Sequence, residues 1–385
     1  MAKGTTNKGK TLKFLHCSDI HLDTPIIGLS ADKSEERRRE IRNSFMSMMQ
    51  FIRDRGVDYC LIAGDLFDTD YITNMTVEIL IREFRNCPGT KFIIAPGRHD
   101  SFDNNPVYCS GRLPENCYIF SSDTLSRFDF LEDKLTVYGW AFKNESITAS
   151  PLYDNHVDDG SNINIVCGYC DLGGEVGSDT APISLADMNK FGADYYALGS
   201  HHGKTDFLKS GGSMYSYSGA LESTGFDEPE LGGVKFLNID YRDGEMSIDG
   251  KHISFGRLSF VTETIDITGV DSNNEITNRI SQLISSKKYG GENAVRIELV
   301  GYVDPRFEVP QQLERDAFGL YYFQIIDKTV PLYGTEHYKR DMSIAGEIYR
   351  RLLPMLESKN ESDRLVASRA FRAALAALEN RDSEA

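Results

Sequence analysis

The chain has 385 residues, of which 40% are hydrophobic and 26% are charged, and its formal net charge is −16. This length suits one large domain with one or two small ones, and no apolar run approaches the roughly eighteen residues of a membrane span. The acidic balance excludes a general basic surface, so any contact with nucleic acid would be local.

Two features of the sequence indicate the cellular compartment in which the protein is expected to be found. Residues 1–10 lack the apolar stretch of a secretory signal and are expected to be disordered. The seven cysteines are scattered without the spacing of a disulfide framework, as is usual in a reducing compartment. We therefore expect a cytoplasmic protein with no membrane association.

Short apolar strands alternate with amphipathic helices in the first half of the chain. A helix capped by Ser34 and ending at Gly56 is expected after the first strand, and a second helix carries Val77 and Phe84 on one face. The pattern predicts an α/β domain with covered sheets over residues 11–255. The strands are expected at 12–17, 59–63, 92–95, 135–138, 163–167 and 195–198.

The pattern changes twice further along the chain. Strands without intervening helices at 214–218, 234–239 and 246–248 suggest the second half of a sandwich, and a β-α-β unit predicts a small α+β domain over 256–333. Residues 334–385 carry two amphipathic helices separated by Pro354 and the polar stretch 358–363, and these helices should dock either on the small domain or on a partner.

Metal-binding side chains follow three of the early strands. Asp19 and His21 are two residues apart and so point the same way from the end of the first strand. A carboxylate with an imidazole suits manganese, iron or zinc. Asp65 follows the second strand, next to Gly64, which allows a close approach of the backbone.

The third strand is followed by Arg98, His99 and Asp100. An imidazole oriented by a carboxylate can protonate a departing alkoxide, so we interpret His99 as an acid oriented by Asp100. Asp68 is interpreted as a structural residue of its turn. In a two-metal phosphoesterase one carboxylate bridges the ions, and Asp65 is the candidate for that role.

Four runs of the sequence together carry a family resemblance: 14–23, 64–68, 197–204 and 215–228. They resemble the calcineurin-like metallophosphoesterases, and within them the SbcD-type DNA repair exonucleases, especially the YhaO-like branch. The resemblance implies a calcineurin-like α/β-β/α sandwich of two sheets with flanking helices, a small α+β cap domain and C-terminal helices. It also implies phosphodiester cleavage at DNA ends with Mn²⁺.

The same resemblance implies how two metal positions would be built. One ion would be held by Asp19, His21, Asp65 and His202, and this set is complete. The other would use Asp65 with three positions that are occupied here by Arg98, Cys167 and Ser200. Because a guanidinium stays protonated and cannot coordinate, we expect one ion rather than two, with Arg98 paired to Asp65 in the vacated volume.

Alternatives remain open for the ligands, the ion and the function. A shift of one residue would make His201 a ligand, and Cys167 could join a Zn²⁺ or Fe²⁺ site, while Mg²⁺ is a further candidate. The chain is expected to be a metal-dependent phosphodiesterase, a catalytically weak module that binds a DNA end or an ATPase partner, or a small-molecule phosphoesterase. By resemblance the partners are DNA ends and a coiled-coil SMC-like ATPase that contacts 334–385; a homodimer is also considered.

Overall fold

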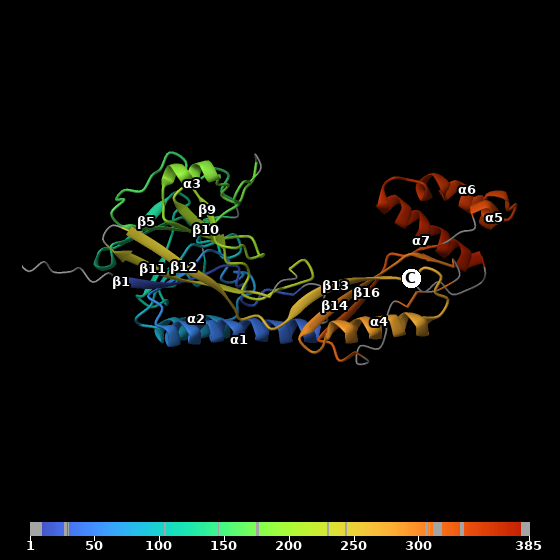
Figure 1. The fold of residues 1–385 in the computed structure, drawn as a ribbon, viewed down its shortest axis with the longest axis horizontal. Helices are drawn as coiled ribbons and strands as arrows, with labels where there is room; N and C mark the ends of the chain where they lie inside the picture. Colours follow the sequence, from blue (N-terminus) through green and yellow to red (C-terminus); the bar gives the residue numbers. More distant parts are fainter. Residues whose placement is uncertain are drawn as a thin grey trace, which may run out of the picture. The chain divides into compact units, whose positions relative to one another are not determined.

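The computed structural model describes residues 10–26, 29, 31–103, 105–144, 146–174, 177–228, 231–242, 245–304, 307, 309–310, 318–331 and 335–378. The expected disorder of residues 1–10 therefore lies outside the described residues, apart from Lys10, which begins the first strand. The chain forms two compact units that divide between Leu258 and Ser259, and each is taken by itself below (Figure 1).

Two sheets form the centre of the first unit within the described residues. In the first sheet four neighbouring strands are parallel and an antiparallel pair joins one side of them; in the second, the four inner strands are parallel and an antiparallel strand closes each edge. The first sheet contains, in spatial order, β12 (Glu245–Ser254), β11 (Gly233–Arg242), β1 (Lys10–Cys17), β2 (Tyr59–Ile62), β3 (Lys91–Ile94) and β4 (Cys117–Ile119). The second contains β5 (Ser126–Phe130), β6 (Leu135–Gly139), β7 (Ile163–Tyr169), β8 (Tyr195–Gly199), β10 (Ser213–Tyr217) and β9 (Leu208–Ser210).

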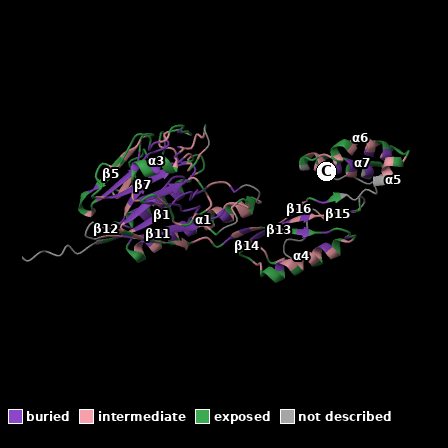
Figure 2. Ribbon diagram, turned by 45° about the horizontal axis from the view of Figure 1, so that its top comes forward, coloured by how far each residue is buried: buried purple, intermediate pink, exposed green. Residues whose placement is uncertain are grey.

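Helices cover the outer faces of this sandwich (Figure 1), and most residues of the sheet strands are buried (Figure 2). Apolar side chains fill the layer between the sheets. Helices α1 (Ala31–Arg55) and α2 (Asn74–Arg85) pack on the first sheet through buried residues such as Phe45 and Leu80. Helix α3 (Leu185–Phe191) packs on the second through Met188 and Phe191. The predicted two-sheet α/β sandwich is confirmed.

Three details differ from the sequence-based expectation. Helix α1 begins at Ala31, so Ser34 lies inside it and does not cap it. A short 3₁₀ helix, η1 (Leu131–Asp133), precedes β6. Strands β11 and β12 join the first sheet through the antiparallel pairing of β11 with β1, instead of forming a second half of their own. Alternating apolar and polar residues predict a strand. Which strand it pairs with depends on the pairing that buries the apolar faces of the sheet.

The second unit begins with a parallel three-stranded sheet. It consists of β13 (Ser259–Asp266), β14 (Asn293–Val300) and β16 (Tyr322–Asp327), and α4 (Asn273–Lys287) packs on it through three buried isoleucines. A small parallel pair, β15 (Tyr302–Val303) with β17 (Val330–Pro331), adjoins it in sequence. These elements match the β-α-β pattern expected from the sequence.

Three helices end the described chain: α5 (Thr335–Arg340), α6 (Ile344–Leu356) and α7 (Glu361–Leu378). Pro354 lies inside the last turn of α6, and the break between α6 and α7 falls at residues 357–360, largely within the polar stretch expected to separate them. Helix α7 contacts the small sheet region, because Arg372 Nη1 lies 2.9 Å from Asp327 Oδ2 and Arg369 donates to the Asp327 carbonyl at 3.3 Å. No helix in the described part of the chain is both long and apolar enough to cross a membrane.

A buried histidine in β1 gives the first unit a testable pH dependence. His16 Nε2 lies 3.1 Å from the Leu198 carbonyl, to which it must donate, and Nδ1 accepts from the Tyr195 hydroxyl at 2.9 Å. Burial lowers the pKa of His16 to about 3. Below pH 6.5 the unfolded chain takes up a proton that the folded chain refuses, so the stability contributed by this group is lost as pH falls.

We expect this single group to lower the free energy of unfolding by about 2 kcal/mol between pH 6.5 and pH 5. Urea unfolding of the chelator-treated protein and of His16→Gln, at several pH values in that range, measures the difference. The variant should lose stability less steeply than the parent as pH falls. Parallel pH profiles for the two proteins would contradict the assignment.

Candidate metal centre

The loops after β1 and β2 hold the first candidate residues by backbone contacts. Asp19 N donates to Gly64 O and His21 N to Asp65 O, each at 3.0 Å. Asp19, His21 and Asp65 have φ values of 50°, 49° and 50°, in the left-handed region that residues with a Cβ seldom adopt. Residues held in such conformations by their surroundings are concentrated at functional sites.

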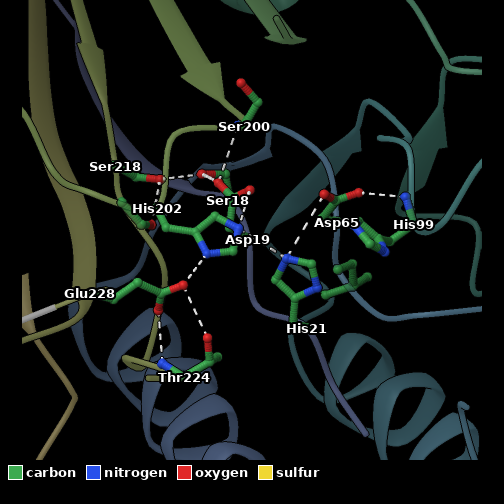
Figure 3. A network of polar contacts seen from close by, with 12 residues as sticks. Ser18, Asp19, His21, Asp65, His99, Ser200, His202, Ser218, Thr224 and Glu228 are labelled. Carbon is green, nitrogen blue, oxygen red and sulfur yellow. Dashed lines mark hydrogen bonds and ion pairs between the residues drawn. The ribbon is translucent and has the colours of Figure 1, made fainter. Parts of the chain in front are cut away.

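Two imidazoles are fixed by carboxylates on their far side, and Figure 3 shows one of these pairs, His202 with Glu228. His21 Nδ1 donates to Asp68 Oδ1 at 2.9 Å, and His202 Nδ1 donates to Glu228 Oε1. Glu228 is itself held by the backbone N–H and the hydroxyl of Thr224, at 2.8 and 3.0 Å. Because both Nδ1 atoms donate to these carboxylates, each ring in its neutral form presents a lone pair at Nε2.

Asp19, His21 and His202 present ligand-type atoms that lie within 4.8 Å of one another, and Asp65 adjoins this group through His21. The Nε2 atoms of His21 and His202 are 3.3 Å apart. His202 Nε2 is 3.6 Å from Asp19 Oδ1, and His21 Nε2 is 3.8 Å from Asp65 Oδ2. Both of these oxygens are buried and have no hydrogen-bond partner among the described residues. Buried carboxylate oxygens are costly in this state, so the arrangement calls for a cation.

The second oxygen of each carboxylate is fixed by the protein. Asp19 Oδ2 accepts from the Ser18 hydroxyl and from the Ser200 backbone N–H, the latter at 3.3 Å. Asp65 Oδ1 accepts from the His99 backbone N–H at 2.9 Å. With one oxygen of each carboxylate anchored, the other is aimed at the point where the imidazole nitrogens meet.

The protonation of these groups reflects the concentration of negative charge. Burial, together with the charge of Asp65, raises the pKa of Asp19. Burial alone would lower the pKa of His21, but the hydrogen bond to Asp68 and the charges of Asp65 and Asp19 raise it to about 9. A divalent cation would satisfy both free oxygens and both Nε2 atoms, and a mixed set of two carboxylates and two imidazoles fits Mn²⁺, Fe²⁺ or Zn²⁺.

A second group of ligand-type atoms shares His21 with the first. It consists of His21, Asp68 and His99, whose candidate atoms lie within 4.8 Å of one another. His99 Nδ1 is 3.7 Å from Asp68 Oδ1, and its side chain is 55% exposed. Asp68 thus orients His21 directly and lies beside His99, although only a role in its turn was expected from the sequence.

Asp100 differs from its expected role. Its carboxylate accepts from the backbone N–H groups of Asp65, Leu66 and Gly97 at 3.1, 2.9 and 2.6 Å, and from the Tyr108 hydroxyl at 2.6 Å. These four donors occupy both oxygens, so Asp100 ties the loops after β2 and β3 together. The expectation that it orients His99 is wrong, because the carboxylate near the His99 ring belongs to Asp68.

Arg98 also differs from expectation in its partner. Its guanidinium binds Asp179, with Nη1–Oδ1 at 3.0 Å and Nη2–Oδ2 at 3.5 Å, and Nη1 donates to Thr180 Oγ1 at 3.1 Å. The expected pairing with Asp65 is therefore wrong. The ring of Tyr169 packs against the loops that carry Asp65 and Arg98. A Cβ added at Gly64 would lie 2.3 Å from Tyr169 Cδ2, and one added at Gly97 would lie 2.9 Å from the same atom.

The other two residues expected near a second ion, Ser200 and Cys167, make their contacts elsewhere. The Ser200 hydroxyl donates to the Cys170 carbonyl at 2.7 Å. Cys167 is fully buried in the apolar layer between the sheets, and burial raises the pKa of its thiol well above the usual range. A thiol that is enclosed by apolar side chains and resists ionisation is a poor metal ligand, which argues against a role of Cys167 in a zinc or iron site.

The loop after β8 brings His202 to the centre and leaves His201 outside it. His201 is exposed, and its ring meets Tyr217 edge-on with the centroids 5.5 Å apart. The roles of Asp68, Glu228 and Tyr169 were not predicted from the sequence. A signal existed for Asp68 and Glu228, each of which ends one of the runs that carry the family resemblance, since a ligating histidine usually has a carboxylate partner.

The carboxylate behind His202 gives a prediction for metal affinity. Glu228→Gln should weaken binding of Mn²⁺ by about 10- to 100-fold, because the neutral amide no longer fixes the Nδ1–H tautomer of His202 or raises its basicity. Isothermal titration of the chelator-treated protein with MnCl₂ measures the dissociation constant. Asp227→Asn, at an exposed neighbouring position, is the matched control and should bind Mn²⁺ like the parent. Equal affinities in both variants would contradict the role of Glu228.

Comparisons with known proteins agree with the resemblance seen in the sequence. The profile of a family described as calcineurin-like phosphoesterase matches residues 12–210. The "Uncharacterized metallophosphoesterase YhaO" of Bacillus subtilis (strain 168) is 26% identical over 306 residues, covering 75% of this chain and 72% of that protein. A subunit of the nuclease SbcCD from Staphylococcus epidermidis (strain ATCC 12228 / FDA PCI 1200) is 25% identical over 270 residues, covering 59% and 68%.

A solved structure also aligns with the chain. It is that of Vacuolar Protein Sorting 29 from Cryptosporidium parvum, at 14% identity and a TM-score of 0.28, covering 63% of this chain and 98% of that one. A score this low supports no argument about fold or function. The relatives and the family profile confirm the predicted resemblance to calcineurin-like metallophosphoesterases and to SbcD-type and YhaO-type proteins.

Proposed function

The chain belongs to the calcineurin-like phosphoesterase family, and from this premise we propose that it is a metal-dependent phosphodiesterase that cleaves DNA and uses one divalent ion. The observation that carries the proposal is the convergence of Asp19 Oδ1, Asp65 Oδ2 and the Nε2 atoms of His21 and His202. A bound divalent ion would supply Lewis-acid polarisation of a phosphate oxygen and a lowered pKa for a water molecule.

The protein's own groups supply the remaining functions. In Asp65 and in Asp19 a hydrogen bond to one carboxylate oxygen fixes the direction of the second oxygen of the same group. Asp68 and Glu228 orient the imidazoles of His21 and His202. His99 is half-exposed at the rim, where its imidazole can give a proton to the departing alkoxide oxygen. Arg98, which precedes His99 in the chain, carries a positive charge that Asp179 partly offsets.

The proposal of one ion instead of two is supported by three side chains. At the positions that the family resemblance assigns to a second ion, the Arg98 guanidinium binds Asp179, the Cys167 thiol lies in the core and the Ser200 hydroxyl binds a carbonyl. None of these three gives a lone pair to the centre. Losing the second cation removes part of the transition-state charge stabilisation, so a slow enzyme is expected.

DNA as substrate is supported by the staphylococcal relative, which is described as part of a nuclease. By the same relation we propose DNA ends as the binding target and a coiled-coil ATPase as the partner of helices α5–α7. We further propose that residues 11–255 form the catalytic domain and 256–333 a cap domain. Manganese is proposed as the ion, ahead of iron, zinc and magnesium.

The decisive experiment combines an ion count with turnover. The chelator-treated protein is loaded separately with Mn²⁺, Fe²⁺, Zn²⁺ and Mg²⁺, dialysed and analysed for metal, and each form is offered linear duplex DNA and bis(p-nitrophenyl) phosphate. We expect about one tightly held ion per chain and metal-dependent cleavage of both substrates. Two ions per chain would refute the single-ion centre.

A second candidate function is a catalytically silent module that binds DNA ends or an ATPase partner. It is favoured by the three positions that present no ligand to a second ion. The same experiment discriminates, because such a module would bind DNA without turnover in every metal. Cleavage of nucleotides or bis(p-nitrophenyl) phosphate without cleavage of DNA would instead point to a small-molecule phosphoesterase, which the net charge of −16 favours.

A further inference from the structure

Helix α1 carries an arginine whose guanidinium is buried beside the loop after β10. Arg37 Nη2 donates to Glu222 Oε2 at 2.6 Å and to the Ser223 carbonyl at 2.8 Å. Glu222 is buried as well, and its other oxygen accepts from the Ser44 hydroxyl. A buried ion pair adds little net stability, because taking both charges out of water offsets their attraction. Stability alone is therefore a weak explanation for this pair.

The peptide group between Ser223 and Thr224 connects Arg37 to the candidate metal centre. The carbonyl of this group accepts from Arg37, and its N–H donates to Glu228 Oε2 at 2.8 Å. The Thr224 hydroxyl donates to Glu228 Oε1 at 3.0 Å, and the same oxygen accepts from His202 Nδ1. Figure 3 shows the part of this chain of hydrogen bonds that runs from Thr224 to His202.

The same helix is fixed to the segment that carries the other imidazole. A second buried arginine of α1, Arg42, donates to Asp23 Oδ1, and Asp23 follows His21 by two positions. Asp23 Oδ2 accepts from the backbone N–H and the hydroxyl of Thr73, at 2.9 and 2.8 Å. Helix α1 is thus tied to the segments that position both rings, and the Nε2 atoms of His21 and His202 are 3.3 Å apart.

Hydrogen bonds that share a peptide group strengthen one another in a buried site. The positive guanidinium polarises the Ser223 carbonyl, which makes the Thr224 N–H a better donor to Glu228. Glu228 is then held in one orientation, and the direction of His202 Nε2 follows from it. Partners behind a ligating histidine set the orientation and basicity of the ring, and so the affinity for the metal.

We propose that Arg37, held in place by Glu222, is a positioning residue of the metal centre: through the peptide group between Ser223 and Thr224 it fixes Glu228, which orients His202. The inference rests on the proposed function, because it requires that a divalent ion binds at this centre. It adds helix α1, which lies outside the proposed set of ligands, to the parts of the protein that determine metal affinity.

The first test measures metal affinity without turnover. Removing Arg37 alone would leave Glu222 buried and unpaired, so Arg37→Met is combined with Glu222→Leu, an apolar replacement of a kind that buried ion pairs often tolerate. Calorimetric titration of the chelator-treated protein with MnCl₂ should give a dissociation constant about tenfold above the parent's, at the low end of the range for partners of a ligating histidine. Urea unfolding verifies that the paired variant is folded.

Arg53→Met combined with Glu83→Leu is the matched control. This ion pair links the same helix to α2, with Arg53 Nη1 2.8 Å from Glu83 Oε2, and its replacement should leave the affinity for Mn²⁺ unchanged. If the Arg37 paired variant does not fold, Arg37→Lys takes its place. The lysine keeps the charge beside Glu222 but is shorter and lacks the planar guanidinium, so binding should weaken at least about threefold. Parental affinity in the folded Arg37 variant would overturn the proposal.

The second test shows whether the ion pair acts through Glu228. In a Glu228→Gln background the chain of hydrogen bonds is already interrupted at His202. The paired replacement of Arg37 and Glu222 should then raise the dissociation constant by less than about twofold, because the two changes act on one network. A further loss of about tenfold in that background would show independent action and would also overturn the proposal.

Turnover tests the proposed function separately. A parent whose Mn²⁺ affinity depends on Arg37, but which cleaves neither DNA nor bis(p-nitrophenyl) phosphate, would refute the proposed function and support the positioning role. A parent that cleaves these substrates, with an affinity for Mn²⁺ that the paired replacement does not change, would refute the positioning role and support the proposed function.

Discussion

Replacing Asp65 with asparagine is expected to lower kcat/KM for phosphodiester cleavage by at least about a thousandfold. The amide oxygen of the introduced side chain can still accept from the His99 backbone N–H, as Asp65 Oδ1 does at 2.9 Å. The NH₂ group then replaces Oδ2, which lies 3.8 Å from His21 Nε2. A donor with no lone pair and no charge would face the cation, so both metal affinity and activation should be lost.

Steady-state cleavage of bis(p-nitrophenyl) phosphate and of linear duplex DNA, with Mn²⁺ in excess, measures this effect. Asp70→Asn is the matched control, because Asp70 is exposed in the next turn, and it should keep the parent's rate. Circular dichroism and urea unfolding of both variants verify that the fold is retained. Cleavage by Asp65→Asn within tenfold of the parent would contradict the assignment of Asp65 as a ligand.

Truncating Asp100 to alanine is expected to lower the free energy of unfolding by about 3 to 5 kcal/mol. The change leaves three buried backbone N–H groups and the Tyr108 hydroxyl without their acceptor. Leaving buried donors unpaired costs more than the loss of an average hydrogen bond, because each group is already out of water. The loops that carry Asp65 and His99 should loosen as a result.

Urea unfolding monitored by circular dichroism measures the loss. Asp103→Ala is the control, because its side chain is 39% exposed and 3.7 Å from Lys143 Nζ, and it should change stability by less than about 0.5 kcal/mol. If Asp100 acted directly in catalysis, Asp100→Asn would reduce turnover while leaving unfolding unchanged. That outcome would rule out the structural role assigned to Asp100.

The strands and the residue types of the centre could be predicted from sequence because both are local properties. Short apolar runs ending in Asp19, Asp65 or His99 predicted strands with polar ends, and the carboxyl ends of parallel strands meet at one edge of a sheet. Asp19, His21 and Asp65 follow β1 and β2 at that edge, and His202 comes to Asp19 and His21 from the loop after β8 of the other sheet. That β11 and β12 pair into the first sheet could not be predicted, because the alternation of apolar and polar residues predicts a strand but not the strand with which it pairs.

The orientation of each side chain was decided only by the tertiary structure. Arg98 binds Asp179, which is 81 positions away in sequence, and Glu228 reaches His202 across 26 positions. Cys167 points into the layer between the sheets because the pairing of β7 with β6 and β8 sets which face each residue takes. Sequence therefore determined which chemical groups the chain offers near the centre. Packing and long-range hydrogen bonds decided which of those groups face it, because they fix rotamers that no local pattern encodes.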